Sequence, residues 1–468
     1  MEGTALIKEQ LPFSKYIAIG VMLFALFFGA GNLIFPAQLG QNAGTNLWPA
    51  VLGFLITGVS LPLLGILAMG YSGSRNLQEL ASRVSPTYGV FFTCLLYLTI
   101  GPFFASPRTS TVAYEVGIAP IVSDNFQQGG LLIFSFLFFA ATLWFSLNPA
   151  KIIDNVGKLL APGIIILLAV LLLLVIIKPM GVMQAPVGDY TDGAFVTGFL
   201  DGYNTMDALA SLVFGIIVIN SVRSLGITSK GGILRATVKS GLVAITLLGV
   251  IYVGIAYMGA TGTEAFGFFD NGGPVLSNAT SYYFGAFGMV MLAILITLAC
   301  LTTAIGLTTA CAEYFQTLFP RFSYKSWVIF FAVLTFAFAN FGLTNIITFS
   351  VPVLMFLYPL AIVLMILAFL SPLFRHKRIV YVLTTIVTFL ISIFDGLKAL
   401  CKSLEIDYFG WMTPFITFYE NVLPMYDKGL GWLLPALIII LITAIVIRII
   451  GPSKAGAQNK VKHGVHQY

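Results

Sequence analysis

Apolar runs of about twenty residues recur along almost the whole 468-residue chain, and they restrict what it can fold into. A helical run of that length matches the hydrocarbon thickness of a bilayer. Only 9% of the residues are charged, against about 25% in an average soluble domain. A soluble fold would leave too much apolar surface in contact with water. We therefore predict an all-α membrane protein whose single transmembrane domain occupies residues 1–468.

The apolar runs define about twelve transmembrane helices. Their approximate ranges are 14–37, 47–70, 88–117, 130–148, 155–177, 193–222, 236–260, 283–316, 326–342, 344–370, 379–396 and 430–450. Twelve spans place both termini on one side, and 19 of the 24 lysines and arginines then fall on that side. Because cytoplasmic loops are enriched in these residues, we predict that both termini are cytoplasmic. Basic residues divided among short loops argue against nucleic-acid binding.

Two short polar or glycine-rich stretches interrupt spans that would otherwise be continuous. The first is Gly29-Ala30-Gly31-Asn32 in span one, and the second runs from Gly202 to Asp207 in span six. A helix broken at membrane depth is tolerated only where it lines a cavity. The spacing suggests two inverted five-span units, about 14–177 and 193–370, with appended helices at about 379–450. Secondary transporters place their binding site at such a repeat interface.

The two breaks also predict what kind of molecule binds. A broken helix offers N–H groups with partial positive charge at one half-helix and free carbonyls at the other. A zwitterionic amino acid needs both, and glycine lets the backbone approach it closely. The predicted substrate-binding residues are Phe28, Gly29, Ala30, Gly31, Asn32, Gly202, Tyr203, Asn204 and Met206.

Two charged residues at membrane depth need separate interpretations. Asp207 precedes Ala208 and is a good N-cap for the second half of span six, although it is also a candidate proton carrier. Arg108 lies in span three with Glu115 seven residues further on, hence on the same helix face. The favoured interpretation of these two residues is an ion pair at the outer interface, and the alternative for Arg108 is a gate residue.

Other features of the chain carry less functional information. The three histidines lie outside the predicted spans, and no hydrolase, metalloprotease or P-loop motif occurs. We therefore predict that the chain is not an enzyme, with a membrane-embedded enzyme using Asp201 and Asp207 as a remote alternative. The four cysteines have no paired spacing and are read as apolar residues. Residues 74–84 and 228–239 are predicted to form short amphipathic helices at the inner interface.

Span eight contains two adjacent hydroxyls, Thr302 and Thr303, in an apolar setting. Na⁺ is satisfied by several neutral oxygens, and two hydroxyls with a carbonyl one turn earlier supply three. Threonines in membrane helices often bond only to their own i−4 carbonyl. From the residues alone, both an ion site and an ordinary helix remain open.

The sequences around the two breaks carry a specific resemblance. The run LFALFFGAGNLIFP at residues 23–36, and DGYNTMDALA at 201–210, resemble the first and sixth spans of the bacterial branched-chain amino acid:cation symporters, the BrnQ or LIV-II family. The resemblance covers nearly the whole chain. It implies a LeuT-type fold of the amino acid–polyamine–cation superfamily in a bacterial inner membrane. The implied function is import of leucine, isoleucine and valine, coupled to Na⁺ and without an organic cofactor. Proton coupling through Asp207 is the alternative.

The same resemblance implies where the ion binds. The carbonyls of Ala25 and Phe28 in span one would hold Na⁺ together with the Ala299 carbonyl and the Thr302 and Thr303 hydroxyls of span eight. In some relatives a second sodium touches the substrate carboxylate, and here it would use Phe27 and Asn32.

Overall fold

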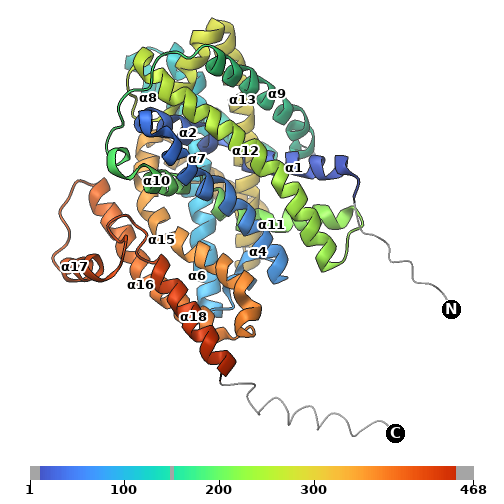
Figure 1. Cartoon of the computed structure of the whole chain (residues 1–468). Coiled ribbons are helices and arrows are strands. Elements are labelled where there is room, and N and C mark those ends of the chain that lie inside the picture. The colour runs from blue at the N-terminus through green and yellow to red at the C-terminus, as the bar shows by residue number, and fades with distance from the viewer. Residues whose placement is uncertain (1–10, 148–151, 450–468) are drawn as a thin grey trace.

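The computed structural model describes residues 11–147 and 152–449, which form a bundle of helices (Figure 1). Within these ranges no strand occurs. Eight helical segments there are long and apolar enough to cross a membrane, and four shorter apolar helices accompany them. Each of the twelve predicted spans falls on helix. The predicted all-α membrane fold is therefore confirmed, while the count of twelve crossings stays a prediction.

The helices are named in chain order. They are α1 (Phe13–Phe27), α2 (Ala30–Ala43), α3 (Leu47–Leu55), α4 (Leu61–Ser72), α5 (Leu77–Ala81), α6 (Pro86–Leu98), α7 (Ala105–Gly117), α8 (Gln127–Ser146), α9 (Ile152–Ile177), α10 (Tyr190–Asp201), α11 (Asp207–Ser224), α12 (Lys230–Phe266), α13 (Gly272–Leu318), α14 (Tyr324–Ala339), α15 (Leu343–Leu370), α16 (Arg378–Ser403), α17 (Thr413–Val422) and α18 (Leu433–Ile449). Short 3₁₀ or π turns join several of them.

Both predicted breaks are present. The first separates α1 from α2, because Phe28 and Gly29 adopt extended backbone angles. The second separates α10 from α11 through a 3₁₀ turn at Gly202–Thr205 and Met206, whose φ is 62°. A methionine in the left-handed region is uncommon and is held there by its surroundings. Its side chain is buried, 2% exposed.

A third interruption, which the sequence analysis did not predict, lies in span three. A π turn at Thr99–Phe103 separates α6 from α7, and Gly101 within it has the non-helical angles φ −86° and ψ −117°. Pro102 follows and cannot donate a helical hydrogen bond, which explains why the helix bends here. The bend makes α7 a new helix that begins at Ala105, three residues before Arg108.

The helices pack in two groups. In one, α2 packs on α12, α3 on α10, and α4 on α11; in the other, α7 packs on α13, and α8 on α14. Two crossings in the first group bring backbones into direct contact. A Cβ at Gly40 would lie 1.9 Å from the Ala256 carbonyl oxygen, and one at Gly53 would lie 1.9 Å from that of Phe195. Small residues permit such close packing in membrane bundles. At the red end of the colour scale, α16 and α18 flank the bundle beside α15 (Figure 1).

Loops that were predicted on the same side of the membrane lie together. On one side, the Thr45 N–H donates to the Gln184 carbonyl (3.0 Å) and the Gln41 amide to the Phe269 carbonyl (2.6 Å). On the other, Arg83 donates to the Tyr381 hydroxyl (3.2 Å). These three contacts each join segments that the prediction places on one side of the membrane. Which side is cytoplasmic stays a prediction.

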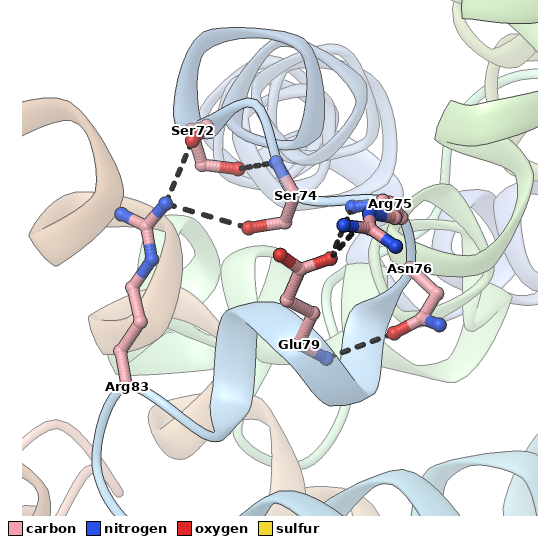
Figure 2. Close-up of polar contacts among 6 residues, drawn as sticks. All are labelled: Ser72, Ser74, Arg75, Asn76, Glu79 and Arg83. Atoms are coloured by element: carbon pink, nitrogen blue, oxygen red, sulfur yellow. Dashed lines mark hydrogen bonds and ion pairs between the residues drawn. The ribbon is translucent and has the colours of Figure 1, made fainter.

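The inner loop after α4 contains the short helix that was predicted there. Figure 2 shows Asn76 capping the Glu79 N–H (2.8 Å) at the start of α5, and Glu79 accepting from the Arg75 N–H (2.9 Å). Arg83 donates to the carbonyl of Ser72 (2.7 Å), so α5 is fastened to the end of α4. The second predicted short helix, 228–239, is wrong, because α12 runs without interruption from Lys230 to Phe266.

Candidate functional site

A small cavity of about 40 Å³, room for a few water molecules, lies where the two breaks meet α7 and α13. Polar and charged side chains line part of it and apolar side chains line the rest. The lining residues are Leu26, Phe27, Gly29, Ala30, Gly31, Asn32, Ile100, Ala105, Arg108, Thr109, Thr205, Met206, Asp207, Ala210, Phe214, Thr303 and Leu307.

A buried cluster of three polar side chains joins the two broken spans at this cavity. The Asn32 amide Nδ2 donates to Asp207 Oδ2 (2.5 Å) and to the Tyr252 hydroxyl, and that hydroxyl donates to Asp207 Oδ2 (3.1 Å). All three residues are at most 4% exposed. The Asn32 side-chain oxygen accepts the Gly29 N–H (2.9 Å). The Asn32 side chain therefore accepts a backbone N–H at the start of α2 and donates to the Asp207 carboxylate at the start of α11.

The predicted capping role of Asp207 is wrong. The residue at the N-cap of α11 is Met206, and Asp207 is the first residue inside the helix. Its carboxylate makes no capping hydrogen bond and accepts from Asn32 and Tyr252 instead. The left-handed conformation of Met206 turns the chain one residue earlier than predicted, which directs the Asp207 side chain into the cavity.

The predicted ion pair between Arg108 and Glu115 is also wrong. Arg108 lines the cavity and is 2% exposed, and its Nη1 donates to the Asn204 carbonyl (2.8 Å). Glu115 accepts instead from the Asn271 amide (2.9 Å). Both residues lie on α7 after the bend, and seven residues of helix separate them by about 10.5 Å along the axis, whereas the side chains that meet on a helix are three or four residues apart. The bend before Ala105 explains instead why Arg108 lies at the cavity and not at the outer surface. The prediction assumed one straight helix along span three, whereas α7 starts afresh with Arg108 in its first turn.

The predicted substrate residues divide into two sets. Gly29, Ala30, Gly31, Asn32 and Met206 line the cavity. The others lie near the breaks but do not line it. Phe28 stacks on Phe24 with ring centroids 4.8 Å apart, and Tyr203 stacks on Tyr358 at 4.0 Å.

Two more of the predicted substrate residues act through their backbones. Gly202 packs against Thr57, whose Oγ1 would lie 1.9 Å from a Cβ at this position. Asn204 contributes its carbonyl to Arg108. The second break therefore contributes mainly backbone, together with Met206 and Asp207, to the surroundings of the cavity.

Of the residues implied for the ion site, only Thr303 lines the cavity, whereas Ala25, Phe28, Ala299 and Thr302 do not. A Cβ at Gly29 would lie 3.4 Å from the Thr303 hydroxyl oxygen, so α13 meets the first break here. Both threonine hydroxyls donate to the Ala299 carbonyl, Thr302 at 2.8 Å and Thr303 at 3.1 Å. Phe27 and Asn32, implied for a second sodium, also line the cavity.

Sequence reasoning missed several residues of the site. Tyr252 lies on α12, 220 residues from Asn32, in an apolar run with nothing to distinguish it. Phe214, Leu307 and Ile100 belong to three different spans and share no motif. Asp201, the other half of the predicted enzyme pair, accepts from the Tyr190 hydroxyl and does not line the cavity.

A helical membrane fold with two broken spans around a shared cavity is the LeuT-type fold. Comparison with solved structures agrees. The inward-facing structure of Mhp1 matches with a TM-score of 0.58 at 15% identity, over 95% of this chain and 94% of that one. MhsT in complex with L-phenylalanine matches with a TM-score of 0.54 at 16% identity, over 91% and 98%. These likenesses establish the fold.

Sequence comparison identifies the family. The family model described as "Branched-chain amino acid transport protein" matches residues 13–450, and the chain belongs to this family. The chain is 47% identical to the branched-chain amino acid permease BrnQ of Bacillus subtilis, over 92% of this chain and 96% of the relative. It is 48% identical to BrnQ of Lactobacillus delbrueckii, over 94% and 98%. The family predicted from the sequences around the breaks is confirmed.

Proposed function

We propose that the chain is a secondary active symporter that imports leucine, isoleucine and valine across a bacterial inner membrane together with Na⁺. The observation that carries this proposal is the cavity between the two breaks, in a member of a family of branched-chain amino acid transport proteins. The relatives named as branched-chain amino acid permeases support the substrate class.

The lining of the cavity suits an amino acid with a branched aliphatic side chain. The N-terminal ends of α2 and α11 both meet at it, and helix N-termini favour a carboxylate. Phe27, Phe214 and Leu307 supply apolar surface for the side chain. An apolar wall of this kind discriminates weakly between side chains that differ by one methylene, by about 1–3 kcal/mol.

The proposed Na⁺ site fits the oxygens available at the first break. The Gly29 N–H, which would bond to the Ala25 carbonyl in a continuous helix, donates to Asn32 instead. The Ala25 carbonyl is therefore released from its i+4 donor. The Thr302 and Thr303 hydroxyls give their protons to Ala299, which leaves their lone pairs for a cation. Bound Na⁺ would be held by these oxygens with the Phe28 and Ala299 carbonyls, and it supplies the driving force for uptake.

The proposed transport cycle exposes this cavity alternately to the two sides of the membrane. The residue ranges 14–177 and 193–370 would act as the two inverted units, with the residues after about 379 appended to them. Both broken spans lie in the group that packs through Gly40 and Gly53, and α7 and α13 belong to the other group. The two groups also touch directly, because the start of α13 packs on α2, where a Cβ at Gly272 would lie 1.9 Å from the Ile34 carbonyl oxygen. Relative movement of the two groups would open and close the cavity between them.

Uptake into proteoliposomes tests the proposal. Purified protein should accumulate radiolabelled leucine when an inward Na⁺ gradient is imposed and should not when K⁺ replaces Na⁺. If the wild-type protein accumulates leucine from a pH gradient in the absence of Na⁺, transport is coupled to protons and not to Na⁺. Chemical conversion of leucine in the vesicles would contradict transport as the function.

A further inference from the structure

Arg108 is buried at the cavity and leaves most of its hydrogen-bonding capacity unused. Its guanidinium makes a single hydrogen bond among the described residues, from Nη1 to the Asn204 carbonyl, and Nε has no partner. No ion pair of Arg108 occurs in residues 11–147 and 152–449. Burying an unpaired charge is costly, and arginine normally meets this cost with a carboxylate or phosphate held by two hydrogen bonds. The guanidinium lies over the Phe35 ring, 5.0 Å from its centroid, which fixes its plane.

Asp207 is an acidic residue that lines the same cavity. Its Oδ2 accepts from Asn32 and Tyr252, two donors that suit the ionised carboxylate. Both of these hydrogen bonds go to Oδ2, which leaves Oδ1 free of the Asn32 and Tyr252 donors. Arg108 and Asp207 therefore present unused hydrogen-bonding capacity of opposite sign to one cavity, without forming an ion pair with each other.

We propose that Arg108 and Asp207 form a charge clamp for the two ends of a zwitterionic α-amino acid, with Arg108 binding its carboxylate and Asp207 its ammonium group. The clamp rests on the proposed function and adds to it. Backbone groups of the breaks offer partial charges, whereas the clamp supplies a full counter-charge to each end of the substrate.

The clamp also ties substrate binding to the second break. Arg108 holds the Asn204 carbonyl, and Asp207 begins the helix that follows that break. A ligand held between them contacts α7 from one packing group and α11 from the other. A bound amino acid thus bridges the two groups, which a ligand with only one of the two charged ends does not do.

Equilibrium binding of truncated ligands tests the clamp. Purified protein in lipid nanodiscs, in saturating Na⁺, is titrated with leucine, with 3-methylbutylamine, which lacks the carboxylate, and with 4-methylpentanoate, which lacks the amine. Removing one partner from a buried charge pair costs enough to weaken binding by at least about 30-fold. We therefore expect the wild-type protein to bind either truncated ligand at least about 30-fold more weakly than leucine.

The variants Arg108→Gln and Asp207→Asn assign each charge to its residue. In Arg108→Gln, leucine should bind about 30-fold more weakly and its advantage over 3-methylbutylamine should nearly vanish, while its advantage over 4-methylpentanoate remains. In Asp207→Asn the reverse should hold. Arg108→Lys keeps the charge but loses the planar guanidinium group, so its affinity for leucine should lie between those of the wild type and Arg108→Gln.

A purely structural role for Arg108 predicts a different result. Loss of the hydrogen bond from Arg108 to Asn204 would then weaken the binding of all three ligands by the same factor. That result would overturn the clamp. The matched control is Arg83→Gln, which removes a partly buried arginine that also bonds to a backbone carbonyl, but at the end of α4 and away from the cavity. It should leave all three affinities unchanged.

Two outcomes separate the clamp from the proposed function. If the wild-type protein binds leucine and the ligand ratios do not depend on Arg108 and Asp207, the clamp is wrong and the proposed function stands. If it binds alanine or phenylalanine with these ratios intact but not leucine, the clamp stands and the proposed substrate class is wrong. Binding of no zwitterionic amino acid would overturn both.

Discussion

The Asn32 amide donates a 2.5 Å hydrogen bond to the Asp207 carboxylate across 175 residues of sequence, and it thereby joins the two broken spans. The same side chain accepts the Gly29 N–H at the start of α2. One residue therefore determines both how the first break is satisfied and how the acid of the second is oriented. In Asn32→Ala the buried Asp207 carboxylate loses a donor and the Gly29 N–H loses its acceptor.

We expect Asn32→Ala to lower the stability of the folded protein by about 1–3 kcal/mol for each polar group left unpaired. Thermal unfolding in detergent should show a lowered midpoint, and leucine affinity should fall as well. Tyr252→Phe is a milder variant, because it removes one donor to Asp207 and keeps the ring that packs edge-on against Phe54. An unchanged midpoint in both variants would show that the cluster does not stabilise the fold.

The ion site predicts a graded loss of Na⁺ affinity. Thr302→Val and Thr303→Val each remove one hydroxyl while conserving shape, and each should weaken apparent Na⁺ affinity by about tenfold or more, since an interaction with a charged partner is worth about 1.5–3 kcal/mol. Na⁺ titration of leucine uptake measures this. Leucine affinity at limiting Na⁺ should fall and then recover at high Na⁺, because ion and substrate binding are reciprocally linked.

Thr308→Val is the control for the ion site. Thr308 is on the same helix and buried, and its hydroxyl makes no hydrogen bond, so valine should fit without loss. If Thr308→Val lowers the apparent Na⁺ affinity as much as Thr303→Val does, a general effect on α13 would explain the result in both variants.

The first break should not tolerate a branched side chain. A Cβ at Gly31 would lie 3.3 Å from the Phe35 ring and 3.5 Å from the Thr205 Cα, and the rest of a leucine would then extend into the cavity. Gly31→Leu should abolish leucine binding in a nanodisc assay. Gly231→Leu, at an exposed position with nothing within 4 Å of its Cβ, should bind leucine normally. Normal affinity in Gly31→Leu would exclude the cavity as the substrate site.

Cysteine labelling tests the predicted sidedness. In a variant without native cysteines, Ala265→Cys should react with an impermeant thiol reagent added outside intact cells, and Arg321→Cys should react only after permeabilisation. Both positions are exposed. Gly272 lies in the same predicted outer loop but is unsuitable, because a Cβ there would lie 1.9 Å from the Ile34 carbonyl oxygen. Outside labelling of Arg321→Cys would reverse the topology.

The sequence predicted the membrane fold, the family and both breaks because these features are local. The segment from Gly29 to Asn32 interrupts an apolar run, and such an interruption predicts a broken membrane helix whatever its neighbours are. The partners of that segment could not be predicted, because hydrophobic periodicity says nothing about which helices meet. Tyr252 became recognisable only when α12 was placed beside α2.

The misplacement of Arg108 shows how one local feature changes a site. A straight helix of span three puts this residue about 30 Å from Tyr88 by helical rise, near the outer surface. Gly101 and Pro102 were visible in the sequence, and their neighbourhood was the available signal for a bend. The angles at that bend depend on packing against Cys311 of α13, whose sulfur would lie 2.4 Å from a Cβ at Gly101.

The backbone contacts at Gly40 and Gly53 have a mechanical consequence. Helices separated by side chains can slide by small rotamer adjustments, but no such layer lies between Gly40 and Ala256 or between Gly53 and Phe195. The helices at these two crossings should therefore move together as one rigid unit. Whatever rotates during a transport cycle must pivot at joints elsewhere in the chain. Three of the interruptions in the described backbone lie beside the cavity: the gap after Phe27, the turn before Asp207 and the bend before Ala105. The backbone segments that would bend during transport are therefore the same segments that surround the proposed substrate site.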